Sequence, residues 1–422
     1  MAAQLETTDE SAARAGGMFR ALSYRNFRLF WTGAFLSNVG TWMQAVAQGW
    51  LVYQLTNSTF WLGLDGFMAT VPGLLLTLLG GVFADLVDRR RLLMYTQIGA
   101  GLSALTLALL VVTGVVHVWM ILALSFVTGC CMALAGPSYQ AFTVDLVGRE
   151  DLANAIALNS TQFQLSRVIG PVFAGLAFNT LGLAGCFFGN AASFIAVIIT
   201  LSLVRFENIN PTAPAHSMKD KRAIWQDLVE GVRYVRRRQR VFMLLLIAAV
   251  TSLFGAPYLT LMPYFARDIM HLDEKGLSIL MGMSGAGACC AALSLAFLGN
   301  FRYKGWSVLG GAFFFAVCLL GFSLSTRLYI SMLFVFGAGF SIVACVAVIN
   351  TLLQQLVTDE MRGRVMSMFI LSFVGMMPLS NLIAGAASQR FGAPHTLATG
   401  GLIIALVITL ITLTNHRIRA LH

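Results

Sequence analysis

Charge is scarce in this chain. Asp, Glu, Lys and Arg together make up only 11% of its 422 residues, whereas apolar residues make up 58% and the mean hydropathy is +0.78. A typical soluble domain carries about 25% charged residues. The composition therefore excludes an ordinary soluble domain and indicates a chain that lies in a lipid bilayer.

The motifs of enzymes and of cofactor-binding proteins are also missing. The sequence contains no phosphate-binding loop, haem attachment motif or hydrolase triad, so we expect neither an enzyme nor a bound cofactor. Its seven cysteines lie in apolar runs without zinc-binding spacing, so we expect free thiols and no metal site. The first 24 residues hold no apolar core, so we expect no cleavable signal peptide.

Long apolar runs separated by short polar breaks fill most of the sequence. A transmembrane helix needs about 20 apolar residues, and runs such as Leu102–Val116 lack the alternation of a membrane-spanning strand. Helices are expected because every backbone amide in lipid must bond within its own segment. The pattern predicts an all-α polytopic membrane protein with twelve transmembrane helices. The expected spans are 27–53, 60–83, 92–115, 118–140, 153–178, 183–204, 241–265, 276–299, 305–325, 328–350, 365–388 and 394–414.

The Lys and Arg residues lie mostly in alternate breaks, on the side that also holds both termini. The breaks on the other side hold only Arg267, Lys275, Arg327 and Arg390. Because cytoplasmic loops carry an excess of Lys and Arg, both termini are predicted to be cytoplasmic. The net charge of +10 then indicates attraction to the anionic lipids of the inner leaflet, and no nucleic acid is expected as a partner.

The one long polar interruption divides the spans into two sets of six. Within it, Ile224, Leu228, Val232 and Val235 recur at helical spacing and predict an amphipathic helix that lies on the membrane. The predicted organisation is a cytoplasmic N-terminal segment (1–26), an N-terminal six-helix half (27–204), a cytoplasmic linker (205–240), a C-terminal six-helix half (241–414) and a cytoplasmic tail (415–422).

A faint internal repeat supports this division. Gly175 and Gly182 recur as Gly385 and Gly392, at a constant offset of 210 residues. Parallel six-helix halves with the substrate between them are a known transporter architecture, in which the halves rock to alternate access.

The break between the second and third spans, from Gly80 to Arg91, reads Gly-Gly-Val-Phe-Ala-Asp-Leu-Val-Asp-Arg-Arg-Arg. It resembles the signature of the major facilitator superfamily, although Leu86 stands where that family usually has a basic residue. The resemblance implies a conformational latch, in which an aspartate neutralises a helix end and arginines pair with acidic groups or lipid phosphates. A simple positively charged cytoplasmic loop is the alternative. The latch residues are Gly81, Asp85, Asp88, Arg89 and Arg90.

The fifth span carries Gly170, Pro171 and Gly175, which resemble the superfamily motif associated with antiporters. Ala174 replaces the usual second glycine of that motif. The resemblance implies a role in coupling, whereas a packing kink is the alternative, because Gly and Pro bend a membrane helix and let a neighbour approach.

A wider resemblance covers most of the chain. Segments 22–31, 149–155 and 359–365 are similar to one branch of bacterial exporters in that superfamily, which includes macrolide efflux proteins, the enterobactin exporter and related secretion effectors. The resemblance implies the major facilitator fold and a monomeric secondary transporter of the bacterial inner membrane. Such a transporter exports a small hydrophobic or amphiphilic compound (a drug, siderophore or secondary metabolite) in exchange for protons. The alternatives are a proton-independent lysophospholipid transporter and a non-transporting receptor or scaffold.

Polar residues inside two spans mark a candidate substrate site. Arg167 lies near the middle of the fifth span, where an unpaired cation costs at least about 2.5 to 3.5 kcal/mol, so it should face a cavity or a partner. The other polar residues of the two spans recur at helical spacing and therefore share one face of each helix. They predict an aqueous path for the substrate, with hydrogen bonds between helices as the alternative. They are Asn159, Gln162 and Ser166 in the fifth span and Ser37, Thr41, Gln44 and Gln48 in the first.

One acid lies clearly within a span of the first half. Asp65 is about five residues into the second span, and a desolvated carboxylate there could carry a proton. An interfacial aspartate with ordinary solvation is the alternative. Asp268, beside Arg267 at the end of the seventh span, is expected to form a loop ion pair.

Overall fold

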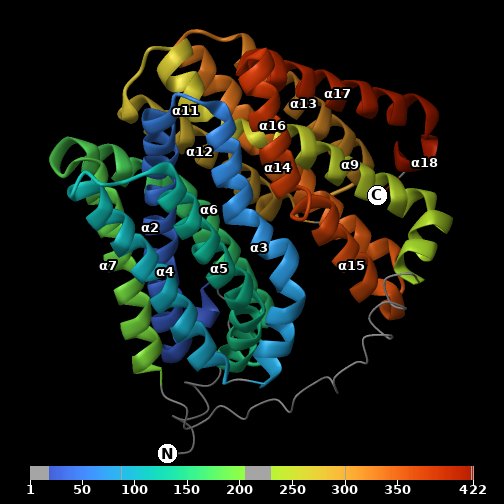
Figure 1. The fold of residues 1–422 in the computed structure, drawn as a ribbon. Coiled ribbons are helices and arrows are strands. Elements are labelled where there is room, and N and C mark those ends of the chain that lie inside the picture. The colour runs from blue at the N-terminus through green and yellow to red at the C-terminus, as the bar shows by residue number, and fades with distance from the viewer. Residues whose placement is uncertain (1–18, 87, 205–229, 300, 420, 422) are drawn as a thin grey trace, which may run out of the picture.

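The computed structural model describes residues 19–86, 88–204, 230–299, 301–419 and 421, and of residues 77–86, 416 and 417 it describes the backbone alone. Every regular element in these residues is helical (Figure 1). In chain order the elements are η1 (Arg20–Ser23), α2 (Arg25–Thr56), α3 (Thr59–Leu86), α4 (Arg89–Val112), α5 (Val118–Val147), α6 (Leu152–Thr180), α7 (Gly182–Leu203), α9 (Gln239–Gly255), α10 (Pro257–Thr260), α11 (Met262–Tyr264), η2 (Phe265–Ile269), α12 (Glu274–Leu298), α13 (Lys304–Leu324), α14 (Leu328–Leu356), α15 (Asp359–Phe373), α16 (Met377–Phe391), α17 (Ala393–Thr414) and α18 (His416–Arg419).

Ten helical segments among the described residues are long and apolar enough to cross a membrane. Two further long helices, α2 and α6, are not among the ten, although they have 32 and 29 residues. Both carry the polar residues noted in the sequence, such as Gln44 in α2 and Arg167 in α6. Their polar residues are expected to face other helices, because polar side chains in membrane helices face the bundle interior.

The spans expected at 241–265 and 365–388 are each built from shorter helices. Pro257 begins α10, and Pro263 lies in α11, after which the chain continues as a π-helix, η2. In the second case α15 and α16 are separate helices, and Pro378 lies in the first turn of α16. Proline interrupts the helical hydrogen-bond ladder because it lacks a backbone N–H.

The predicted amphipathic helix lies mostly outside the described residues, which include neither Ile224 nor Leu228. The described part, residues 230–237, is helical. Glu230 at its start forms an ion pair with Arg364 of α15, with 2.5 Å between the charged atoms. The end of the linker is therefore attached to the following helices by side-chain contact.

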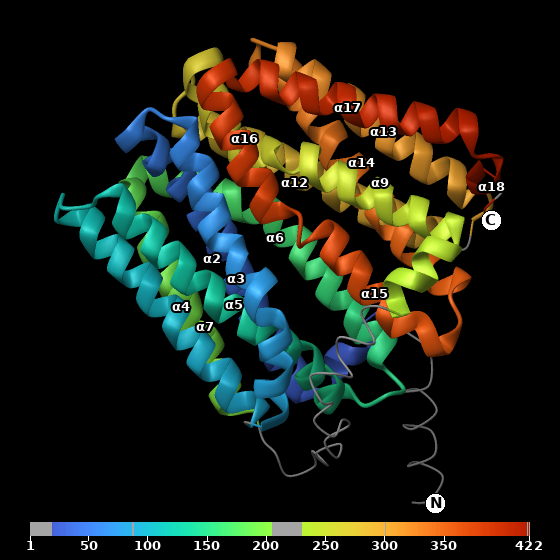
Figure 2. The same cartoon turned by 45° about the vertical axis from the view of Figure 1, so that its right-hand side comes forward.

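The long helices pack as two groups, which Figure 2 shows side by side. In the first group, α2 packs against α6 and α7, α3 against α5, and α4 against α5 and α7. In the second group, α14 packs against α12 and α13, while α17 packs against α13, α16 and α9. The chain thus fills one group before it begins the other.

Two helix pairs make most of the contact between the groups, α6 with α12 and α3 with α16. The pairing is reciprocal, because the fifth span of each group (α6; α15 with α16) packs on the second span of the other (α12; α3). The glycines of the internal repeat fit this symmetry. Gly182 and Gly392 precede or begin the last long helix of each group with φ of +66° and +85°, values that glycine adopts without strain.

The contact between α3 and α16 depends on two glycines that face each other. A Cβ built on Gly385 would lie 2.7 Å from the Cα of Gly63 and 2.9 Å from the carbonyl oxygen of Thr59. Small residues let the backbones of membrane helices approach closely. Any side chain at Gly385 would therefore push the two groups apart at this point.

We predict that Gly385→Ala lowers the stability of the folded transporter by about 1 to 3 kcal/mol, as expected for overpacking of a tight interface. The check is the unfolding temperature of the detergent-solubilised protein. It is measured by size-exclusion chromatography of samples heated to increasing temperatures. Gly310→Ala is the matched control, because a Cβ on that helical glycine meets nothing within 4 Å. Equal unfolding temperatures for Gly385→Ala and the wild type would contradict the prediction.

Candidate functional site

A chain of hydrogen bonds crosses the first group through the polar stripe of α2. The Gln48 amide donates to the Asp65 carboxylate of α3 at 2.9 Å, and the Gln44 amide donates to Gln48 at 3.2 Å. Asn190 of α7 donates to Gln44 at 2.7 Å, and Ser125 of α5 donates to Asp65 at 2.5 Å. Four helices therefore contribute to one polar chain that ends at Asp65.

The other two residues of the predicted α2 stripe do not join this chain. Thr41 donates to the carbonyl oxygen of Ser37, one turn earlier in the same helix, at 2.9 Å. Ser37 is buried. The structure thus brings Gln44 and Gln48 together with Asp65, and leaves Ser37 and Thr41 in contacts within α2.

Within the described residues, Asp65 accepts hydrogen bonds only from neutral donors. Its carboxylate bonds to the Gln48 amide and to the Ser125 hydroxyl, and the ion pairs of the described residues do not include it. Asp65 is half-buried, and its carboxylate is held by these neutral donors of α2 and α5.

The polar stripe of α6 lies mostly against α5. Gln162 donates to the Tyr139 hydroxyl at 3.0 Å, and Asn159 is 3.4 Å from both Tyr139 and Thr143. Ser166 donates to the Gln162 carbonyl at 2.8 Å and is fully buried, as Gln162 nearly is. Asn159 and Gln162 are thus placed as in the alternative interpretation, in which polar residues connect helices by hydrogen bonds, whereas Ser166 bonds within α6.

Arg167 lies at the junction of the two groups. Its guanidinium lies over the ring of Trp42 of α2, 5.1 Å from the centroid, and one nitrogen is 3.4 Å from the Gln164 amide oxygen. Tyr258 of α10 is near enough to Arg167 for both an electrostatic and a side-chain hydrogen-bond interaction. The backbone at Arg167 also contacts α12 so closely that a Cβ on Gly285 would collide with the Arg167 carbonyl. The partner expected for this cation is thus an aromatic ring, and the described residues offer no carboxylate at ion-pair distance.

The antiporter-like motif lies on the packing faces of α6. Gly170 packs against α2, where an added Cβ would meet Trp42 and the backbone of Val39. Gly175 faces Ser278 of α12, with 3.4 Å from a built Cβ, and Pro171 lies 3.8 Å from the corresponding position on Gly282. α6 runs without interruption through Pro171. The motif therefore lets α6 contact one helix of each group.

The predicted latch is described in part. Gly81 and Asp85 belong to the last turns of α3, and their side chains lie outside the described residues. Asp88 caps α4 by accepting from the Arg91 amide at 2.9 Å, Arg89 pairs with Asp145 of α5 at 2.7 Å, and Arg90 donates to the Ser202 carbonyl at 2.8 Å. These bonds all lie within the first group. Asp145 was missed in the sequence, where it is an isolated acid near the end of the fourth span.

Direct bonds between the groups gather at one end of the molecule, called here the Tyr53 end. The Tyr53 hydroxyl of α2 donates to the Asp268 carboxylate of η2, and Arg267 lies over the Tyr53 ring, 5.5 Å from its centroid. Nearby, Ser58 donates to Gln389 of α16 at 2.8 Å. The prediction of an ion pair between Arg267 and Asp268 was wrong, because both side chains reach across to Tyr53.

The opposite end, called the Arg89 end, has ion pairs inside each group. Arg20 pairs with Asp151 at 3.1 Å, and Tyr24 donates to the same carboxylate at 2.7 Å. This hydrogen bond raises the pKa of the Tyr24 phenol above its ordinary value, because ionisation would lose the bond and place two anions together. Towards this end the ribbons of α3 and α15 diverge (Figure 2).

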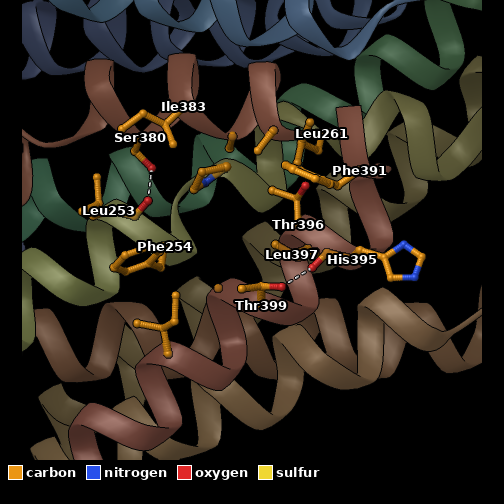
Figure 3. A pocket seen from close by; sticks show the side chains of 15 residues that line it. Leu253, Phe254, Leu261, Ser380, Ile383, Phe391, His395, Thr396, Leu397 and Thr399 are labelled. Carbon is orange, nitrogen blue, oxygen red and sulfur yellow. Dashed lines mark hydrogen bonds between the residues drawn. The ribbon is translucent and has the colours of Figure 1, made fainter. Parts of the chain in front are cut away.

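A pocket of about 650 Å³ lies between α9, α10, α16 and α17 of the second group. Figure 3 shows Ser380 donating to the Leu253 carbonyl and Thr399 to the His395 carbonyl, so both hydroxyls are satisfied by backbone. Most of its remaining lining is aliphatic or aromatic, including Phe254. The pocket is therefore suited to an apolar group.

We predict that Tyr53→Phe weakens the contact between the groups at the Tyr53 end, because Asp268 loses a hydrogen bond to a charged acceptor worth about 1.5 kcal/mol or more. The check is the distance distribution between spin labels on cysteines introduced at Gln54 and Lys275, in a background without the native cysteines. The population of separated groups should rise about fivefold or more.

Asp268→Asn is the matched variant for the same contact. If the two side chains act together, the double variant should separate the groups no further than either single variant does. Distance distributions that stay as in the wild type would show that the bond does not hold this end closed.

Comparison with known proteins identifies the family. The transmembrane secretion effector family matches residues 16–422. The staphyloferrin A transporter of Staphylococcus aureus is 24% identical, with 93% of this chain and 97% of that protein covered. Macrolide efflux protein A of Streptococcus pyogenes is 22% identical, with 91% and 96% covered.

A solved structure shows the same fold. It is a bacterial homologue of the human lysosomal transporter Spinster in an inward-facing, unoccupied conformation, with a TM-score of 0.67, 15% identity, and 93% of this chain and 95% of that chain covered. Because the family match extends over almost the whole sequence, the chain belongs to the transmembrane secretion effector family of the major facilitator superfamily, a family of multi-pass membrane transporters and not of enzymes.

Proposed function

We propose that this protein is a secondary active exporter that exchanges a small hydrophobic or amphiphilic compound for protons across the bacterial inner membrane. The exported compound is a drug, a siderophore or a secondary metabolite. The names of the relatives support this class, since they include a siderophore transporter and a macrolide efflux protein. The protein works as a monomer in contact with membrane lipids and needs no cofactor.

The proposed topology has twelve transmembrane helices in two six-helix halves, with both termini in the cytoplasm. The halves correspond to the two packing groups. The ten segments that are apolar enough to span, together with α2 and α6, give the twelve helices. The distribution of Lys and Arg supports cytoplasmic termini. In this topology the Tyr53 end lies on the outer side and the Arg89 end on the cytoplasmic side.

Alternating access by rocking of the halves is the proposed mechanism. Bonds between the groups at the Tyr53 end, together with the divergence of α3 and α15 towards the Arg89 end, favour a state that is open to the cytoplasm. In the opposite state the latch residues Gly81, Asp85, Asp88, Arg89 and Arg90 hold the cytoplasmic ends together. Arg89 and Asp145 then keep the latch in position within the first half.

The observation that carries proton coupling is the environment of Asp65. It is a carboxylate inside α3 whose donors are an amide and a hydroxyl and for which the described residues supply no ion-pair partner. A carboxylate without a neighbouring cation can bind a proton at little electrostatic cost, whereas an ion pair would keep it charged. Asp65 is thus the proposed proton site, and its hydrogen bonds to α2 and α5 transmit its protonation state to the helices that surround the path.

The first prediction of this proposal concerns export itself. Cells that lack other efflux pumps and express this chain should accumulate less of at least one compound from a panel of macrolides, catecholate siderophores and cationic dyes. A protonophore should restore accumulation to the level of cells without the protein, because it removes the proton gradient. Export that persists in the presence of the protonophore would contradict proton antiport.

The second prediction separates proton coupling from substrate movement. Asp65→Asn should abolish uphill export in proteoliposomes with an imposed pH gradient, yet it should leave exchange of labelled for unlabelled substrate within about twofold of the wild type, since exchange needs no net proton movement. Asp273→Asn is the matched control, because Asp273 caps α12 through the Gly276 amide and asparagine caps equally well. Uphill export by Asp65→Asn at the wild-type rate would exclude Asp65 as the proton site.

The pocket of the second group favours one other candidate, proton-independent transport of a lipid such as a lysophospholipid. Its apolar lining between α9, α10, α16 and α17 suits an acyl chain (Figure 3). A fluorescent lysophospholipid that leaves the inner leaflet at the same rate with and without the protonophore would favour this candidate. A lipid that does not move would favour the first proposal.

A further inference from the structure

Arg167 is a cation in the middle of a helix that contacts both groups. It lies 15 residues after the start of α6 and 13 before its end, which places it about 20 Å from either end at 1.5 Å per residue. Solvent at a helix end is therefore too distant for the side chain to reach. A charge at this depth must be stabilised by the groups around it.

The part of the chain that the structure describes does not supply a negative charge next to Arg167. Apart from Asp65, the acids among the described residues lie at helix ends or in loops, and none forms an ion pair with Arg167. Asp65 has its own partners in Gln48 and Ser125. The positive charge at the junction of the groups is therefore uncompensated.

The hydrogen-bonding capacity of the guanidinium is only partly used. An arginine has five N–H donors in a planar arrangement. One nitrogen makes a long contact of 3.4 Å to Gln164, the Tyr258 side chain is near enough for a hydrogen-bond interaction, and the Nε atom is buried without a partner. A planar anion with two oxygens would match the remaining donors, because guanidinium groups bind carboxylates and phosphates through two parallel bonds.

Aromatic side chains surround this cation. Trp42 lies beneath the guanidinium, and the exposed ring of Phe163 meets Trp42 edge to face with 6.2 Å between centroids. On the side of the second group, the Tyr258 hydroxyl is engaged with Ser284 at 2.7 Å. The site thus places the Trp42 ring of α2 and the buried Tyr258 of α10 beside the Arg167 cation of α6.

We propose that Arg167 recognises an anionic group of the exported compound, and that this compound carries a carboxylate or a comparable oxyanion next to an aromatic ring. The guanidinium binds the oxyanion through its free donors, and the ring of the substrate packs against Trp42. This proposal rests on the proposed export function and names its substrate class. In this proposal the proton binds at Asp65 and the anion binds at Arg167, so the two ions have separate binding sites.

Two xanthene dyes with opposite charge test the proposal in inside-out membrane vesicles energised with a proton gradient. Carboxyfluorescein is an anion and rhodamine 6G is a cation on a similar ring system. The wild type should concentrate carboxyfluorescein in the vesicles in preference to rhodamine 6G. Arg167→Gln should reduce carboxyfluorescein uptake about tenfold or more, as expected when a charged two-bond contact is lost.

Two further variants make the result specific. Arg167→Lys keeps the charge and should retain part of the carboxyfluorescein uptake. Arg390→Gln removes the same charge from an arginine in the last turn of α16, where its guanidinium lies over the Phe391 ring. This variant should leave uptake unchanged. All variants are compared at equal amounts in the membrane and equal unfolding temperature.

Three results would overturn the proposal. They are a preference of the wild type for rhodamine 6G, an equal loss of both dyes in Arg167→Gln, and no uptake of carboxyfluorescein at all. The export function is judged separately by the compound panel and the protonophore. Export of panel compounds without uptake of carboxyfluorescein would therefore refute the anionic substrate and leave the exporter intact.

Discussion

Close approach of helix backbones between the two groups is the constraint on which the rest of the structure depends. In lipid there is no hydrophobic force to press helices together, so their association depends on packing and on hydrogen bonds. Gly63 with Gly385 and Gly285 with the Arg167 carbonyl supply that packing at the two helix pairs that join the groups. The same approach brings Arg167 of the first group into range of Tyr258 in the second. The candidate site is thus a consequence of how the groups touch.

Asp65 in α3 and Arg167 in α6 do not form an ion pair with each other. A direct ion pair between them would gain Coulomb energy, yet it would also fix both groups in one ionisation state. Each is instead held by neutral or aromatic neighbours: Gln48 and Ser125 around the acid, and Trp42 beneath the cation. In the proposed mechanism, this separation leaves Asp65 free to exchange a proton and Arg167 free to bind an anion.

Much of the fold could be read from the sequence, because the length of an apolar run and the membrane thickness fix where a helix can lie. The polar stripes of α2 and α6 also stood out, since helical spacing places residues on a face. The spacing could not say which neighbour that face would meet. Gln162 and Ser166 therefore pointed to an open path, whereas in the structure they pack against α5 or within α6.

Contacts between residues that are far apart in the sequence could not be predicted, for the same reason. Tyr53 and Asp268 are 215 residues apart, and neither looks unusual in its own segment. Pro257 and Pro263 were visible in the sequence as potential breaks, but only the structure shows that they lead into a π-helix whose end carries Arg267 and Asp268 towards Tyr53. Local sequence thus sets each helix, whereas the bonds between groups depend on the register of packed helices.

The positions of these contacts along α6 and α2 have a mechanical consequence for the proposed rocking motion. The Tyr53 contact lies near one end of α2 and must separate when that end opens. The contact between Gly285 and the Arg167 backbone lies midway along α6, where rotation of one group against the other displaces atoms least. A substrate bound to the Arg167 side chain would therefore lie beside the axis of the motion. From there it can be exposed to either side of the membrane by small changes at the site and large changes at the two ends.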